Sequence, residues 1–213
     1  SCETTCPSGV KYGRLIDISR GLMEKEMPRP PKERWIRWSL ARVLPNRQLF
    51  GLLLRMGQLF RPVLPGKLRT KVPPRKQASP WPAASHERIV LALAGCVQPS
   101  ATPNTNAAAA RVLDRLGITM VEAPDAVCCG AVNHHLSEHE KALEAMRRNI
   151  DAWWPAIDAG AEAIIMTASG CGAMVQEYGH LLKDDPVYAA KAQKVSELTI
   201  DLGAFMLKQD LEK

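Results

Sequence analysis

The segment RIVLALAGC, residues 88–96, sets the architecture of this chain. Its six consecutive apolar residues, 89–94, are typical of a strand that is buried on both faces of a parallel sheet. Cys96 then stands at the carboxyl end of the strand. Residues 118–121 (ITMV) and 163–166 (AIIM) repeat the pattern and predict a second and a third strand. We therefore predict an α/β domain with a parallel sheet over residues 88–207.

The intervening segments have helical signals. Residues 106–116 predict a helix that Gly117 ends. Ser137 and Glu140 form the pattern of a capping box, which predicts a helix from there to about residue 160, with a kink or break at Pro155. A further helix is expected after Cys171. Strands that alternate with helices favour right-handed crossovers, which place all the loops after the strands on one edge of the sheet.

That edge is where the cysteines of this domain fall. Cys96, the pair Cys128-Cys129 and Cys171 each come after a different predicted strand, and each is expected in a loop. Ligands of open parallel sheets bind just beyond the carboxyl ends of the strands. We therefore expect the four thiols to converge into one site, although 31 residues separate Cys96 from Cys128 and 41 separate Cys129 from Cys171.

Four readings of these thiols are open. An iron–sulfur cluster is favoured, because thiolates are its usual ligands and adjacent cysteines can reach different irons of one cluster. A closed four-thiolate shell also suits Zn²⁺, although adjacent cysteines strain a single tetrahedral site. The thiols could instead be buried apolar groups. A disulfide between Cys128 and Cys129 would need a strained backbone.

The other two cysteines lie at the start of the chain, in CETTCP. The three-residue gap between Cys2 and Cys6, followed by Pro7, matches the end of the bacterial ferredoxin run C-x2-C-x2-C-x3-C-P. In two-cluster ferredoxins the last cysteine of such a run ligates the other cluster, so Cys2 and Cys6 are predicted to ligate different clusters. A chance pair and half of a zinc site are the alternatives. We expect the sequence to be a piece of a longer protein.

Residues 24–87 separate this cysteine segment (1–23) from the α/β domain. Between Arg29 and Lys76 there are 13 lysines and arginines and one acid, Glu33, whereas the whole chain has a net charge of +6. Apolar residues at helical spacing predict two short amphipathic helices, near 35–43 and 49–60, and four prolines predict an extended linker over 73–82. This basic connector is interpreted as a solvated or partner-facing surface, with an interfacial membrane helix as the alternative.

Other functions are less favoured. There is no G-x-G-x-x-G motif and no evident pair of general acid and base, so substrate chemistry is expected on a partner. His134 and His135 are interpreted as exposed loop residues rather than as metal ligands. No uncharged run approaches the roughly 20 residues of a membrane-spanning helix. The cysteine spacing lacks the regularity of a secreted disulfide scaffold, which favours a reducing cytoplasm.

Taken in order, these motifs resemble a known family. Cys2-x3-Cys6-Pro7-Ser8-Gly9-Val10, a basic linker, Cys96, Cys128-Cys129-Gly130 and Cys171-Gly172 resemble the iron–sulfur subunit of glycolate oxidase (glycolate dehydrogenase) and, more broadly, the cysteine-rich CCG domain superfamily. The resemblance covers nearly the whole chain. Members normally carry a complete two-cluster ferredoxin segment and a second CCG domain, so we expect the first ferredoxin motif and the second CCG domain to lie outside the given sequence.

The resemblance implies an electron-transfer subunit with 4Fe-4S clusters, two in the complete ferredoxin-like segment and one at the CCG site, with zinc as the alternative there. It implies FAD-containing subunits that oxidise glycolate to glyoxylate and a quinone or other electron acceptor as partners, and no nucleic acid. A cytoplasmic location follows, with peripheral attachment to the inner face of the membrane as a variant. The alternatives are a subunit of a lactate or glycerol-3-phosphate dehydrogenase or of a heterodisulfide-reductase-like complex, and a zinc-binding scaffold.

One departure bears on the chemistry. The broader CCG pattern ends in C-x2-C, whereas Cys171 is followed at that spacing by Met174. The remaining four cysteines suffice for a four-thiolate cluster, but direct disulfide chemistry becomes less favoured.

Overall fold

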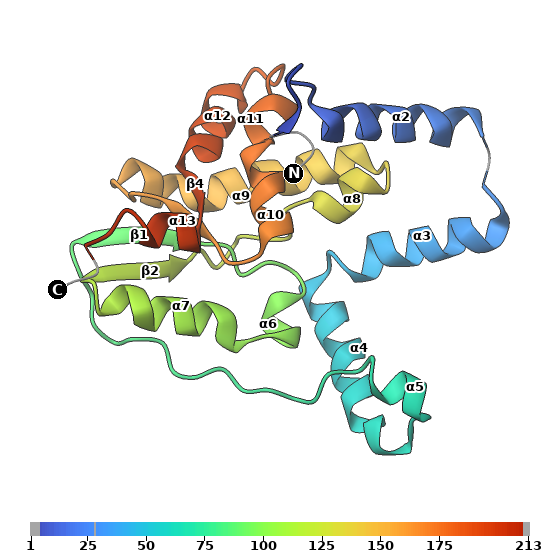
Figure 1. The fold of residues 1–213 in the computed structure, drawn as a ribbon, viewed down its shortest axis with the longest axis horizontal. Helices are drawn as coiled ribbons and strands as arrows, with labels where there is room; N and C mark the ends of the chain where they lie inside the picture. Colours follow the sequence, from blue (N-terminus) through green and yellow to red (C-terminus); the bar gives the residue numbers. More distant parts are fainter. Residues whose placement is uncertain (1–4, 28, 211–213) are drawn as a thin grey trace.

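Four parallel strands form one sheet in the described part of the chain (Figure 1). The computed structural model describes residues 5–27 and 29–210. The strand order is β2-β1-β3-β4, and every neighbouring pair is parallel. The strands are β1 (Arg88–Ala92), β2 (Ile118–Glu122), β3 (Ile164–Met166) and β4 (Thr199–Asp201). The predicted α/β fold with a parallel sheet is confirmed.

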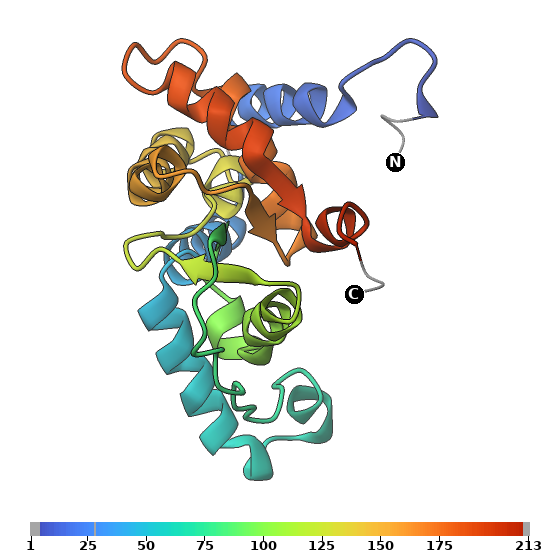
Figure 2. The ribbon, with the colours of Figure 1, turned by 90° about the vertical axis from the view of Figure 1, so that its left-hand side faces the viewer.

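Helices cover both faces of this sheet (Figures 1 and 2). Leu91 and Leu93 face a core built with helices α9, α10, α11 and α12, whereas Val90 and Ala92 face a second core built with α7 and α13. Successive residues of a strand point to opposite faces, so the continuous apolar run of β1 serves both cores. The helices of the two layers are α7 (Asn104–Asp114), α9 (His139–Asp158), α10 (Ser169–Gln176), α11 (Tyr178–Leu181), α12 (Ala189–Leu198) and α13 (Leu202–Met206).

Helix α9 differs from the sequence-based prediction in two ways. Its N-cap is Glu138, no side chain caps it, and Ser137 has a positive φ of 66°, so the predicted capping box does not form. The helix also does not break at Pro155, but continues to Asp158. Proline removes one backbone hydrogen bond of the helix, but Trp153 and Ile157 on either side of it are buried in the core, and this packing holds the turn in helical form.

The basic connector is helical, as predicted. Two helices are followed by a 3-10 turn, a four-residue helix and then a segment without helix or strand, residues 73–87. None of the described helices is long and apolar enough to cross a membrane. The helices outside the two layers are α2 (Tyr12–Glu26), α3 (Pro31–Val43), α4 (Arg47–Leu59), the 3-10 helix η1 (Arg61–Val63), α5 (Gly66–Arg69), α6 (Gln98–Ala101) and α8 (Ala131–His135).

Candidate metal centre

The structure brings Cys96, Cys128, Cys129 and Cys171 together beyond the carboxyl ends of the strands. Cys96 lies in the loop after β1, and Cys128 and Cys129 lie in the loop after β2. Cys171 was expected in a loop, but it lies in the first turn of α10. Cys96, Cys128 and Cys129 are buried in the core that faces α9, and Cys171 is half-buried against it.

The four sulfur atoms form a continuous series of contacts. The Sγ atoms of Cys96 and Cys128 are 3.4 Å apart. Hydrogen bonds from the Cys129 and Cys96 thiols lower the pKa of Cys128 to about 3, while the contact with Cys128 raises the pKa values of Cys96 and Cys129. A hydrogen bond from Cys129 also lowers the pKa of Cys171. Four thiols this close together fit a bound metal or cluster, because a cation stabilises the thiolate form of all four at once.

Gly130 explains why the cysteine pair is followed by glycine. It has a φ of +89° and forms the N-cap of α8. A Cβ atom at this position would lie 3.2 Å from the carbonyl oxygen of Ala142 in α9. Both the left-handed backbone and the close approach to α9 therefore require a residue without a side chain.

Two buried polar side chains that sequence reasoning missed hold the backbone of this loop. The amide of Asn149 in α9 accepts a hydrogen bond from the N–H of Val127 at 2.7 Å and donates to the carbonyl oxygen of Cys128 at 2.9 Å. The hydroxyl of Tyr178 donates to the carbonyl oxygen of Cys129 at 2.9 Å. Asn149 also donates to the Tyr178 hydroxyl at 3.0 Å, so the two side chains act as one brace. In the sequence, the signal for this brace was Asn149, a polar residue on the apolar face of the predicted helix.

A second buried amide ties the strand ends to each other. Asn106 donates to the carbonyl oxygen of Leu93 after β1 and to the carboxylate of Glu122 at the end of β2. It accepts from the hydroxyl of Thr167 after β3 at 2.6 Å and from Gln98 at the same distance. Three strand ends are thus held together beside the thiols.

Met174 occupies the position where the broader cysteine pattern has another thiol. It is buried in the same core as Cys96, Cys128 and Cys129. A thioether is only a weak acceptor and is a poor substitute for a thiolate. The four thiols therefore stay the predicted ligands of this site.

Cys6 is not part of this thiol cluster. Cys2 falls outside the described residues, so its ligand role stays a prediction. Cys6 is followed by a tight turn in which the N–H of Gly9 donates to the Cys6 carbonyl at 3.1 Å. Hydrogen bonds from the N–H groups of Val10 and Ser8 lower the pKa of the Cys6 thiol. Backbone donors of this kind are also the partners of cluster-bound sulfur.

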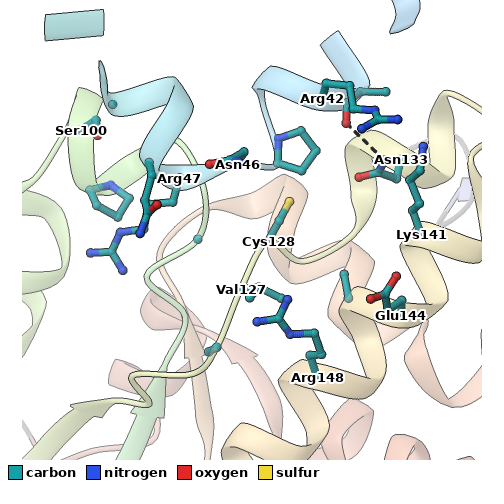
Figure 3. A pocket seen from close by; sticks show the side chains of 18 of the residues that line it. Arg42, Asn46, Arg47, Ser100, Val127, Cys128, Asn133, Lys141, Glu144 and Arg148 are labelled. Carbon is teal, nitrogen blue, oxygen red and sulfur yellow. Dashed lines mark hydrogen bonds between the residues drawn. The ribbon is translucent and has the colours of Figure 1, made fainter. Parts of the chain in front are cut away.

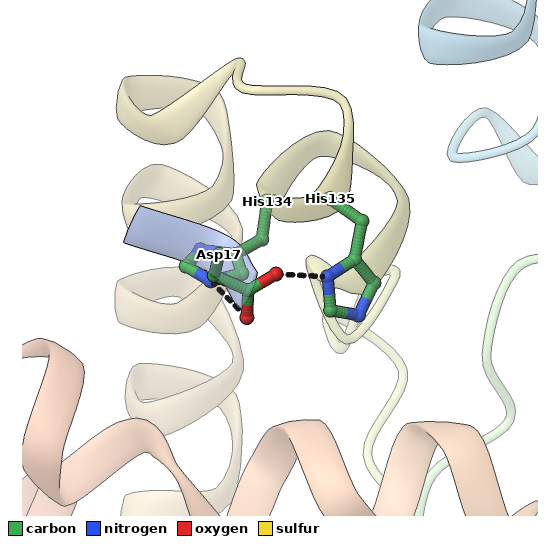
Figure 4. Close-up of side chains that lie close together, drawn as sticks. All are labelled: Asp17, His134 and His135. Atoms are coloured by element: carbon green, nitrogen blue, oxygen red, sulfur yellow. Dashed lines mark hydrogen bonds and ion pairs between the residues drawn. The ribbon is translucent and has the colours of Figure 1, made fainter. Parts of the chain in front are cut away.

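The interpretation of the two histidines as loop residues is wrong, because both lie in α8, and only His135 is exposed as expected (Figure 4). The His134 side chain is only 12% exposed, whereas that of His135 is 52% exposed. Asp17 of α2 lies between them, with carboxylate oxygens 3.4 Å from His134 and 3.1 Å from His135. One ligand atom of each residue lies within 4.8 Å of the others, a spacing that could hold a metal ion. The shared carboxylate links α2 to the α/β domain.

Comparison with known proteins identifies relatives over the whole chain. Residues 90–176 match the family model described as the cysteine-rich domain CCG. The chain is 54% identical over 214 residues to the glycolate oxidase iron-sulfur subunit of Escherichia coli (strain K12), an alignment that covers 100% of this chain and 53% of that protein. The chain therefore spans about half the length of this relative.

Two further relatives bear on the assignment. The probable glycolate oxidase iron-sulfur subunit of Bacillus subtilis (strain 168) is 31% identical over 240 residues, which cover 100% of this chain and 53% of that protein. Lactate utilization protein A of Bacillus cytotoxicus is 39% identical over 105 residues, which cover 49% of this chain and 41% of that protein. No solved structure matches the chain. The resemblance drawn from the cysteine motifs is thus confirmed.

Proposed function

Because the chain carries a CCG cysteine-rich domain and is similar over its whole length to iron–sulfur subunits of glycolate oxidase, we propose that it is the electron-transferring part of a glycolate-oxidising complex. The observation that carries the proposal is the convergence of four thiols at the carboxyl edge of the sheet. In this role a partner subunit with bound FAD oxidises glycolate to glyoxylate, and the electrons leave toward a quinone or another acceptor.

The residues of the site have distinct tasks in this proposal. Cys96, Cys128, Cys129 and Cys171 would bind a 4Fe-4S cluster, which when bound supplies a one-electron relay. Asn149 and Tyr178 hold the backbone that carries the cysteine pair, and the apolar core around the thiols excludes water. Burial and hydrogen bonds of this kind set the potential of a bound cluster.

The N-terminal segment extends the proposal. Cys2 and Cys6 would each complete a cluster of a two-cluster ferredoxin-like segment, in which 1–23 is the final part, 24–87 the connector and 88–207 the CCG domain. These clusters would receive or deliver electrons on the path to the thiol site. The protein would act in the cytoplasm, with peripheral attachment at the inner face of the membrane if the acceptor is a quinone.

The test uses the full-length protein, purified anaerobically with its flavin partners. Addition of glycolate is expected to bleach the visible iron–sulfur absorbance, and C128S is expected to lower the iron content by about one 4Fe-4S cluster while leaving the signals of the ferredoxin clusters in place. Val187 is exposed, so V187S serves as the control and should change neither the iron content nor the ferredoxin signals. Unchanged iron content in C128S would contradict the assignment of the site.

Lactate oxidation is a second candidate, since part of the chain is similar to a protein named for lactate utilisation. Reduction of the complex by each substrate distinguishes the two candidates. If L-lactate reduces the complex faster than glycolate does, lactate oxidation is favoured. A zinc scaffold is the third candidate. Zinc–sulfur bonds of about 2.3 Å place tetrahedral sulfurs roughly 3.8 Å apart, which is close to the 3.4 Å between Cys96 and Cys128. Zinc without iron and acid-labile sulfide in the anaerobic protein would establish that reading.

A further inference from the structure

A cleft of about 960 Å³ opens beside the thiol site and has strongly cationic walls (Figure 3). Cys128 lines this cleft together with the loop that precedes it. Its charged lining residues are five cations and a single carboxylate, Glu144. The cations are Arg42, Arg47, Arg55, Lys141 and Arg148.

The arginines of the cleft have no acidic partner within residues 5–27 and 29–210. Ion pairs occupy other arginines, such as Arg88 with Glu162, but none involves Arg47, Arg55 or Arg148. Arg42 lies over the ring of Trp38, 5.7 Å from its centroid. Several uncompensated guanidinium groups around one concave surface produce a positive potential that attracts anions.

The connector helices are fixed to the α/β domain where they form this cleft. Helix α4 approaches α6 so closely that a Cβ atom on Gly51 would lie 2.8 Å from the hydroxyl oxygen of Ser100. The side chain of Asn133 in α8 donates to the carbonyl oxygen of Ala41 in α3 at 3.4 Å. The basic residues near the junction of α3 and α4 are therefore held over the thiol site.

The start of α4 adds to the charge. Asn46 is its N-cap, and its side chain accepts only the N–H of Leu49, which leaves the N–H groups of Arg47 and Gln48 without a helical partner. The positive end of the helix thus lies at the cleft. Arg47 extends from α4 and Arg148 from α9, on either side of Val127 and Cys128 (Figure 3).

We propose that this cleft binds a small molecule with two or more phosphate or carboxylate groups, held by Arg47, Arg55 and Arg148 beside Cys128. The volume suits such a ligand, because small-molecule sites occupy about 300–1,000 Å³. Arginine pairs with the oxygens of either group through two parallel hydrogen bonds. Anion binding in this cleft does not depend on which substrate the flavin partner oxidises, so its test is independent of the function proposed above.

The experiment is calorimetric titration of the full-length holoprotein with pyrophosphate and, separately, with citrate. We expect saturable binding that weakens when salt is raised from about 50 to about 200 mM, as ions screen the exposed charges. R47Q and R148Q should each weaken binding roughly fivefold, and the double variant more than tenfold. R115Q, an exposed arginine outside the cleft, removes the same charge and should have less than a twofold effect.

Three outcomes would overturn the proposal. One is the absence of saturable binding of both probes at millimolar concentration. Another is an equal loss of anion affinity in R115Q and R148Q, which would mean that only the net charge of the protein matters. The third is arginine-dependent binding to phosphatidylglycerol vesicles without binding of either soluble anion, which would identify a lipid surface instead. Iron content and circular dichroism of each variant establish that it is folded and loaded.

Discussion

The α/β domain and the basic connector use the same residue types in opposite ways. Trp153 of α9 is completely buried, whereas Trp35 and Trp38 of α3 are 67% and 55% exposed. In the domain, helices cover both faces of the sheet, so apolar groups are removed from water on all sides. In the connector, the helices contact the domain only along part of their surface. The comparison teaches that amphipathic spacing specifies a helix in both regions, but only surrounding layers turn its apolar side into a core.

The largest difference is expected for tryptophan. W153A should lower the free energy of unfolding by about 3–5 kcal/mol, because it leaves a cavity in a closed core. W35A should change it by less than about 0.5 kcal/mol, since the indole is already in water. Urea denaturation of both variants measures the contrast. Similar losses would mean that α3 is covered in the full-length protein.

Asparagine provides the next contrast. N149L should cost about 2–4 kcal/mol of unfolding free energy, because it leaves the N–H of Val127 and the carbonyl of Cys128 buried without partners. N46A removes the exposed N-cap of α4 and should cost about 1 kcal/mol. N149L should also lower iron retention at the thiol site, which N46A should not. Equal iron content in the two variants would show that the hydrogen bonds of Asn149 are not needed for metal binding at the thiol site.

A smaller effect is expected for glycine. G130A should cost about 1–3 kcal/mol, because alanine resists the left-handed backbone and its Cβ meets the Ala142 carbonyl. At Gly66 of the connector nothing lies within 4 Å of an added Cβ, so G66A should change stability by less than about 0.5 kcal/mol. Thermal denaturation of the pair tests this, and a destabilising G66A would show that α5 is packed in the full-length protein.

The smallest effect concerns the contact of α2 with the α/β domain. Burial lowers the pKa of His134, while the charge of Asp17 opposes the shift and His139 and His135 add to it. The folded pKa then lies below the unfolded value of about 6.5, so the unfolded chain binds more protons near that pH. The contribution of His134 to the free energy of unfolding should therefore be fully present above about pH 6.5 and be lost as the pH falls below that value. Denaturation of wild type and H134Q at pH 7.5 and 5.5 measures this; an equal pH dependence in both would exclude His134 as its source.

Local patterns predicted the strands well where they were long or strongly apolar. Strand β1 was expected at 89–94 and is found at Arg88–Ala92, and β2 and β3 agree within one residue. Strand β4 was missed, because Thr199–Asp201 is too short to show periodicity and follows directly after α12. The capping box at Ser137 failed for a related reason: the spacing was present, but the backbone of the preceding turn has a positive φ.

The sequence by itself determined three of the four parallel strands and that a thiol or thiol pair follows each of these three, since side-chain period and residue type are local properties. Only the tertiary structure decided how Asn149 and Tyr178 support the cysteine loop, that Cys171 lies in a helix, and that the arginines of the connector stand over Cys128. These depend on the packing of segments distant in sequence, such as α4 against α6, and no local pattern carries that information.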